Sequence, residues 1–296
     1  MPSPTPKNAT NALSLIAMLV DHVSDPFFAN FARRIDRRAR NLGFKLVLGS
    51  TENDISFMPK LLSVFNNMNV AGYIIAPPPG VDYDLRKLLR NGKPVVLFDQ
   101  VSAVPGPYTV ISDNFRGAYA AVGHFISNDH RHIALVTSTS GQKRISDRQK
   151  GYKAAMEDHG LPSYVSELPS SAAPEQVKLA VRALLREEPA IDAVLFADFN
   201  LAFTGVAALR QLKKGIPDHI AVIGFDDNES FPLFAPALTA VVEPLDEMVE
   251  KILQCIVGHD GEKQRRAPII LPTRMVIRSS TNKIRSSLRL STPVNP

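Results

Sequence analysis

The chain has 296 residues, of which 45% are hydrophobic, so it can bury one large core or two medium ones and is not globally disordered. Its formal charge of +5 is mild, so composition gives little support for nucleic-acid binding. A single cysteine, Cys255, excludes an intramolecular disulfide and a thiolate zinc cluster, and it is expected to be buried on an apolar helix face. No run reaches the roughly 18 apolar residues of a membrane span. No signal peptide is recognisable either, so a cytoplasmic protein is expected.

The first ordered segment predicts a buried strand, a polar turn and an amphipathic helix. Residues 1–12 are polar and proline-rich and are expected to form a flexible leader. The nearly all-apolar run 13–20 suits a strand that is covered on both faces. Asp25 is the expected N-cap of the helix, with Pro26 at its first position, and Gly43 is the expected stop.

The rest of the chain alternates between the two kinds of element. Further strands are expected at residues 44–48, 71–76, 94–98, 108–111, 132–137, 164–167, 191–196, 219–224, 239–242, 269–271 and 274–278. Helices are expected at residues 54–67, 84–90, 114–127, 144–159, 174–188, 200–213 and 244–257. This alternation predicts an α/β protein with parallel sheets.

The alternating pattern occurs twice, before and after about residue 113. It predicts two similar doubly wound lobes, with a ligand cleft between them and a hinge of three crossings near residues 113, 242 and 270. The first lobe is expected to comprise residues 13–112 and 243–268. The second is expected to comprise residues 113–242 and 269–281, followed by a disordered tail at 282–296.

Enzyme signatures are missing from the sequence. There is no GxGxxG after a strand, no GxxxxGK[ST] and no GxSxG, so dinucleotide, P-loop and serine-hydrolase chemistry have no support. His130 and His132 have no further ligand at metal-binding spacing, and a solvated turn is expected there rather than a metal site. Binding therefore fits better than catalysis, and no catalytic residue, metal or cofactor is expected.

Polar side chains gather where the predicted strands end. Any one of them is equally well explained by the polarity of loops, but as a set they resemble a sugar site. Carboxylates accept hydrogen bonds from adjacent hydroxyls, an arginine donates to sugar oxygens, and an aromatic ring covers the C–H face. The candidate ligand-binding residues are Asp21, Phe27, Phe28, Asp99, Arg148, Asp198, Asn200 and Asp226.

Several segments together resemble the effector-binding region of LacI/GalR (lac-repressor-like) transcriptional regulators. The most specific are DRQKGY, IGFDD with the LTAV that follows it, and the closing IRSST. The resemblance covers about residues 13–281 and implies a fold similar to periplasmic sugar-binding proteins, a small-molecule effector and a homodimer. It implies that Phe27 covers the effector, that Asp99 closes the fourth strand, and that Arg148 and Asp226 contact the effector.

The chain departs from that family pattern at three places. Asp198-Phe199 stands where the family usually has Asn-Asp, and Glu243 stands where many members have Gln or Arg. The usual helix-turn-helix has no counterpart, so operator DNA is expected to be contacted only through a domain absent from this chain. An isolated effector region, a misplaced start and a genuine loss all remain open explanations.

An arginine-rich surface is expected on the first helix. Arg33, Arg34, Arg37, Arg38 and Arg40 should face outward, and a solvated or subunit-facing surface is favoured there over a DNA contact. The favoured function is sugar or metabolite sensing in a LacI-type regulator. The alternatives are a periplasmic-type sugar receptor of a transport system and, much less favoured, an enzyme on a doubly wound fold.

Overall fold

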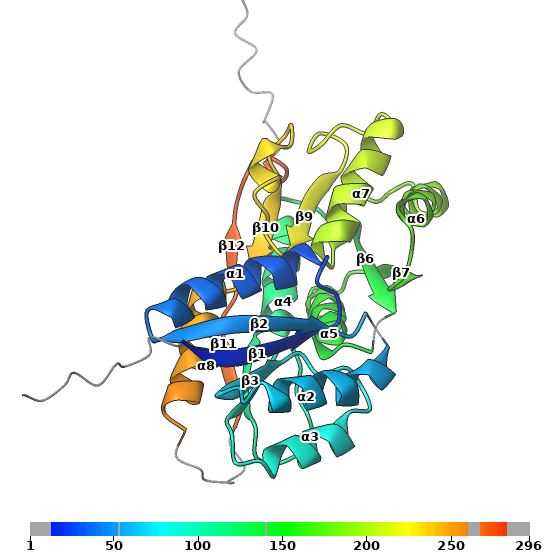
Figure 1. Ribbon diagram of the computed structural model, residues 1–296. Helices are drawn as coiled ribbons and strands as arrows, with labels where there is room; N and C mark the ends of the chain where they lie inside the picture. Colours follow the sequence, from blue (N-terminus) through cyan, green and yellow to red (C-terminus); the bar gives the residue numbers. More distant parts are fainter. Residues whose placement is uncertain (1–12, 53, 140, 260–266, 283–296) are drawn as a thin grey trace, which may run out of the picture. The chain divides into compact units, whose positions relative to one another are not determined.

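A computed structural model describes residues 13–52, 54–139, 141–259 and 267–282 (Figure 1). The predicted leader lies outside these residues, as does the predicted tail except for its first residue. The chain divides into two compact units. Unit 1 comprises Met1–Ile111 and Leu245–Ile270, and unit 2 comprises Ser112–Pro244 and Leu271–Pro296. Glu243, which was expected in the first lobe, therefore belongs to unit 2.

Unit 1 is a sheet in the order β11-β5-β4-β3-β1-β2 with helices on both faces. Neighbouring strands from β2 to β5 pair in parallel. Helices α1 and α8 pack together on one face, and Figure 1 shows α2 and α3 on the other face. The elements are β1 (Ser14–Val20), α1 (Pro26–Arg40), β2 (Phe44–Ser50), the 3-10 turn η1 (Ile55–Phe57), α2 (Met58–Asn67), β3 (Gly72–Ile75), α3 (Asp82–Leu89), β4 (Val95–Phe98), β5 (Tyr108–Ser112), α8 (Leu245–Val257) and β11 (Ile269–Leu271).

Unit 2 repeats the plan in the order β12-β10-β9-β8-β6-β7. The strands pair in parallel except for β12, which pairs antiparallel with β10. Helix α4 packs against α5, and α6 packs against α7. The elements are α4 (Asn114–Ser127), β6 (Ile133–Thr139), α5 (Lys143–Asp158), β7 (Tyr164–Pro169), α6 (Pro174–Glu187), β8 (Ala193–Phe196), α7 (Phe199–Gln211), β9 (Ala221–Phe225), the 3-10 turn η2 (Phe231–Leu233), β10 (Thr239–Val242) and β12 (Arg274–Val276). The predicted fold class is confirmed.

Local chemistry accounts for the start and end of α1. The side chain of Asp25 accepts a hydrogen bond from Phe27 N at 2.9 Å and so satisfies one of the helix's first free N–H groups. Pro26 follows at the start of the helix, where its missing N–H costs nothing. Gly43, with φ +79°, ends the turn after α1 in a conformation that glycine adopts without strain.

One predicted helix is divided in the structure. The segment expected to be helical from residue 54 consists of η1 followed by α2, which begins at Met58. Pro59 explains the division, because it has no N–H to donate to the preceding turn and is tolerated only near a helix start.

The closing IRSST segment ties the edge of the unit 2 sheet together. Ser280 Oγ donates to Val222 O at 2.6 Å and accepts from Thr239 N at 2.8 Å. Arg278 forms a two-pronged ion pair with Asp227, at 2.9 and 2.7 Å. Two segments that carry the sequence resemblance, IGFDD and IRSST, therefore contact each other. Asp227, the second acid of IGFDD, supports the fold at this contact.

Candidate functional site

The strand order of each sheet identifies the edge where a ligand would bind. In a doubly wound sheet, ligands bind outside the carboxyl ends of the strands, where the direction of winding reverses. That point lies at β1 and β3 in unit 1, and at β6 and β8 in unit 2. The predicted acidic residues occupy this edge: Asp21 follows β1, Asp99 follows β4, Asp198 closely follows β8, and Asp226 follows β9.

Asp99 and Asp226 occupy equivalent positions in the two units. Each directly follows the fourth strand of the repeated order, β4 in unit 1 and β9 in unit 2. Each has φ +63°, a left-handed conformation that Asp tolerates better than most residues and that costs about 1–3 kcal/mol in general. The same strained backbone conformation therefore occurs at an acidic residue in the same place of both sheets.

Unit 1 contributes two buried carboxylates and an aromatic cluster. Asp21 and Asp99 are 7% and 6% exposed. The rings of Phe27 and Phe28 lie 5.2 Å apart in an edge-on arrangement, and Phe28 also packs edge-on against Phe98 at 6.0 Å. Phe28 is thus held in the core between α1 and the sheet, and Phe27, at 8% exposed, is the better candidate to cover a ligand.

Arg148 is the centre of the polar site in unit 2. Its side chain extends from α5 and is completely buried. Its Nε donates to Asn114 Oδ1 at 2.7 Å, and its Nη1 donates to Ala197 O at 2.6 Å. Nη1 and Nη2 donate to the two carboxylate oxygens of Asp226 at 3.0 and 2.9 Å, and Nη2 also donates to Glu243 Oε1 at 3.0 Å.

This arrangement keeps Arg148 charged and fixes the strand ends. Burial disfavours the charged guanidinium, but the carboxylates of Asp226 and Glu243 outweigh it and raise the pKa of Arg148 above its usual value. The guanidinium also lies over the ring of Phe225, 4.2 Å from its centroid. Through these contacts one side chain connects α5 with residues at the ends of β8, β9 and β10.

Asp198 and Asn200 have different surroundings. Asp198 is the N-cap of α7 and accepts from Leu201 N at 2.8 Å. Burial, together with the neighbouring charge of Asp226, raises the pKa of the Asp198 carboxyl. Asn200 lies on the exposed side of the first turn of α7. The structure therefore brings Arg148 and Asp226 into direct contact and leaves Asn200 exposed.

Three residues of this network were not among the predicted site residues. Glu243 was noted only as a departure from the family pattern, and Asn114 only as the start of a helix. Arg144, which is 7% exposed, lies with its Nη1 3.9 Å from Asp226 Oδ2. A basic residue one helical turn before Arg148 was the available signal for Arg144. Nothing in the sequence spacing connects Glu243 with Arg148.

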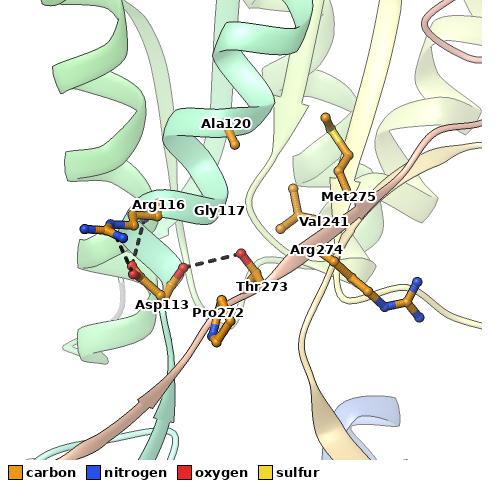
Figure 2. Close-up of a pocket in the computed structure, with 9 residues that line it drawn as sticks. All are labelled: Asp113, Arg116, Gly117, Ala120, Val241, Pro272, Thr273, Arg274 and Met275. Carbon is orange, nitrogen blue, oxygen red and sulfur yellow. Dashed lines mark hydrogen bonds and ion pairs between the residues drawn. The ribbon is translucent and has the colours of Figure 1, made fainter.

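A small pocket lies at the first turn of α4 in unit 2. Figure 2 shows Asp113, Gly117 and Thr273 around it, and its volume is about 200 Å³. Asp113 caps α4 by accepting from Arg116 N at 3.0 Å. Thr273 Oγ1 donates to Asp113 O at 3.5 Å, and this contact ties the segment before β12 to the helix. None of the predicted ligand-binding residues lines this pocket.

The arginine-rich face of α1 meets acidic residues of α8. Arg34 pairs with Asp246, and Arg38 pairs with Glu250. Arg33 and Arg37, together with Arg34, Arg38 and Asp246, line a groove of about 540 Å³. Arg33, Arg37, Arg38 and Arg40 are exposed, and Arg34 is half-buried. The predicted outward direction of these side chains is confirmed for the four exposed ones.

The prediction of a solvated turn at His130 is wrong. His130 is completely buried, with Nδ1 3.4 Å from Asp192 Oδ1 and its ring edge-on to Phe125. Asp192 also accepts from the N–H groups of Arg131 and His132 and so anchors the start of β6.

Within the described residues no group of His, Cys, Asp and Glu is arranged to hold a metal ion. Cys255 is buried, as predicted. No helix in the described ranges is long and apolar enough to cross a membrane.

Comparisons with known proteins agree with this architecture. Residues 122–281 match the family described as periplasmic binding protein-like domain. The HTH-type transcriptional regulator DegA of Bacillus subtilis is 29% identical over 280 residues, which cover 92% of this chain and 82% of the relative. The ribose operon repressor of Halalkalibacterium halodurans is 25% identical over 270 residues, covering 90% of this chain and 79% of the relative.

A solved structure extends the comparison to three dimensions. The crystal structure of a LacI family transcriptional regulator from Enterococcus faecium, with bound ribose, superposes with a TM-score of 0.77. It is 25% identical, and the match covers 90% of this chain and 98% of that one. The chain therefore belongs to the periplasmic binding protein-like domain family, and its relatives are LacI-family regulators, whose effector-binding region it matches.

Proposed function

We propose that this chain senses a sugar or sugar derivative as the effector-binding region of a LacI-type transcriptional regulator. The observation that carries the proposal is the buried Arg148–Asp226 pair at the carboxyl ends of β8 and β9, beside the point where the winding of the sheet reverses. Carboxylates held in place at such an edge are acceptors for the hydroxyl groups of a sugar. The LacI-family relatives support this function over that of a transport receptor.

Each unit has its own set of proposed ligand contacts at its strand ends. Unit 1 supplies Asp21 and Asp99 as acceptors and Phe27 as the covering ring, with Phe28 supporting that ring. Unit 2 supplies Asp226 as the main acceptor, and Asp198 and Asn200 are the further candidates. Arg148 holds Asp226 in position in the structure, and a direct bond from Arg148 to the effector would require one of its present partners to move.

Regulation would follow from a difference in affinity. An effector shifts an equilibrium between two states of a protein only by the ratio of its affinities for them. We propose a cytoplasmic homodimer in which this shift is passed to a DNA-reading domain, as in regulators of the HTH type. We further propose that the chain is not an enzyme, because the relatives are regulators and the site offers no nucleophile paired with a base.

Isothermal titration calorimetry with a panel of sugars, nucleosides and small organic acids tests the proposal. Saturable binding of at least one sugar, with an affinity of micromolar to millimolar order, is expected. If no sugar binds at about 10 mM, the sugar-sensing function is refuted, since that concentration exceeds any physiologically useful dissociation constant. Turnover of the bound ligand, followed by chromatography of the recovered mixture, would instead revive an enzymatic role.

A further inference from the structure

The guanidinium of Arg148 has no hydrogen-bonding capacity left for a ligand. An arginine has five N–H donors. The structure gives all of them acceptors on this chain: Asn114 Oδ1, Ala197 O, both oxygens of Asp226, and Glu243 Oε1. An anionic ligand could bind Arg148 only by displacing one of these acceptors.

Glu243 changes the charge of this cluster. Arg144 and Arg148 carry two positive charges beside Asp226, and the three groups without Glu243 would be net positive. The carboxylate of Glu243, whose side chain is 3% exposed and 3.0 Å from Arg148 Nη2, balances the charges of these four side chains, and the neighbouring Asp198 adds no positive charge. Displacing Glu243 or Asp226 with a ligand anion would leave a buried carboxylate without its cation, which is strongly unfavourable.

Buried cations are few in the described parts of both units. Among the described residues of unit 1, the buried side chains that can carry charge are Asp21 and Asp99, and both are acidic. In the described part of the whole chain, the buried basic side chains with a permanent charge are Arg144 and Arg148. Every other buried group that could meet a ligand at the strand ends either accepts hydrogen bonds or is uncharged.

The carboxylate of Asp226, in contrast, can accept further hydrogen bonds. An ionised carboxylate has about four lone-pair positions, and each oxygen of Asp226 accepts one bond from Arg148. A sugar hydroxyl or amine can donate to the remaining positions without breaking the ion pair. Binding of this kind strengthens the existing arrangement, because the donor adds to the partners of the carboxylate.

We infer that Glu243 sets the charge class of the effector, so that this protein binds a sugar with only hydroxyl or amine groups and rejects its carboxylated and phosphorylated counterparts. The inference rests on the proposed sugar-sensing function and adds the class of sugar. Glu243 acts here as a positioning residue: it occupies the donor of Arg148 that an anion would otherwise use.

Matched sugars provide the test. Titration calorimetry would compare glucose, glucosamine, glucuronate and glucose 6-phosphate, then galactose with galacturonate, and ribose with ribose 5-phosphate. For the parent sugar that binds wild-type protein, the anionic counterpart is expected to bind at least about tenfold more weakly. In Glu243→Gln this ratio should fall by about tenfold, because the amide keeps its shape but removes one negative charge. Glu247→Gln, an exposed acid four residues further along, should leave the ratio unchanged.

The outcomes separate this inference from the function on which it rests. An anionic sugar that binds wild-type protein more tightly than its parent would overturn the inference and leave sugar sensing intact. An unchanged ratio in folded Glu243→Gln, with folding checked by circular dichroism, would overturn the role of Glu243. If Glu243→Gln does not fold, Glu243→Asp replaces it; the shorter acid withdraws from Arg148, and the ratio should again fall. Binding of no sugar of any charge would refute the proposed function itself.

Discussion

Replacing Arg148 with methionine tests the network at its centre. Methionine has a similar length and no donor, so Arg148→Met removes a completely buried cation and leaves two carboxylates behind. Removing one partner of a buried ion pair costs about 3–5 kcal/mol. The acceptors Asn114 Oδ1 and Ala197 O lose their bonds as well. We expect the free energy of unfolding to fall by at least about 3 kcal/mol, a large share of the 5–15 kcal/mol typical of a folded protein.

Urea unfolding at neutral pH, followed by circular dichroism, measures this loss. Arg182→Met, an exposed arginine on α6 in the same unit, is the matched control and should change the free energy by less than about 0.5 kcal/mol. Combining Arg148→Met with Glu243→Gln should recover part of the loss, because one stranded charge is removed. A loss below about 1 kcal/mol for Arg148→Met would refute the argument that buried carboxylates depend on this side chain.

Three further predictions concern stability in unit 2, each measured by urea unfolding. Gly151→Ala should destabilise the protein by about 1–3 kcal/mol, since a Cβ there would lie 2.1 Å from Phe115 O. Gly123→Ala, with open space around it in α4, should stabilise the protein by about 0.5–1 kcal/mol. Equal effects of the two substitutions would contradict the close packing of α5 against α4 at Gly151. The folded-state pKa of Asp198 is raised, so the contribution of this carboxyl to stability is lost as pH rises above 3.8. Asp198→Asn should therefore be more stable than wild type at pH 7, and the difference in free energy of unfolding should close near pH 4. A difference that does not change with pH would contradict this. Burial raises the pKa of Tyr152 to about 12 from 10.0, so the free energy of unfolding of the wild type should fall as pH rises through this range. Tyr152→Phe should have a lower free energy of unfolding at neutral pH, because it lacks the bond to Ile133 O, and should lose less of it at alkaline pH.

Local sequence signals were sufficient for most of the fold. Runs of strand length located the strands of the described residues, and capping residues located the start of the first helix, at Asp25 and Pro26, and its end, at Gly43. The error at residues 54–67 has a local cause too, because Pro59 was recognised as tolerable only near a helix start. The buried position of His130 was missed because its partner, Asp192, lies 62 residues away in sequence.

The candidate site was only partly accessible from sequence. Polar residues after the predicted strands pointed to Asp226 and Arg148, which the structure brings into contact, since parallel strands bring their carboxyl ends to one edge of a sheet. The partner that completes the network, Glu243, lies 95 residues beyond Arg148, and only the strand order brings the two together. The spacing of residues in the sequence could not show that each N–H donor of Arg148 already has an acceptor on this chain.

The most direct test of the central claim is the affinity of Asp226→Asn for the sugar that binds wild-type protein. Asp129→Asn is the matched control, because Asp129 has a similar left-handed backbone, φ +66°, and an exposed side chain. Hydrogen bonds to charged groups contribute about 1.5–3 kcal/mol, so the affinity of Asp226→Asn should fall by roughly 10- to 100-fold in calorimetry. Wild-type affinity in folded Asp226→Asn would contradict the claim that the strand ends of unit 2 bind the effector.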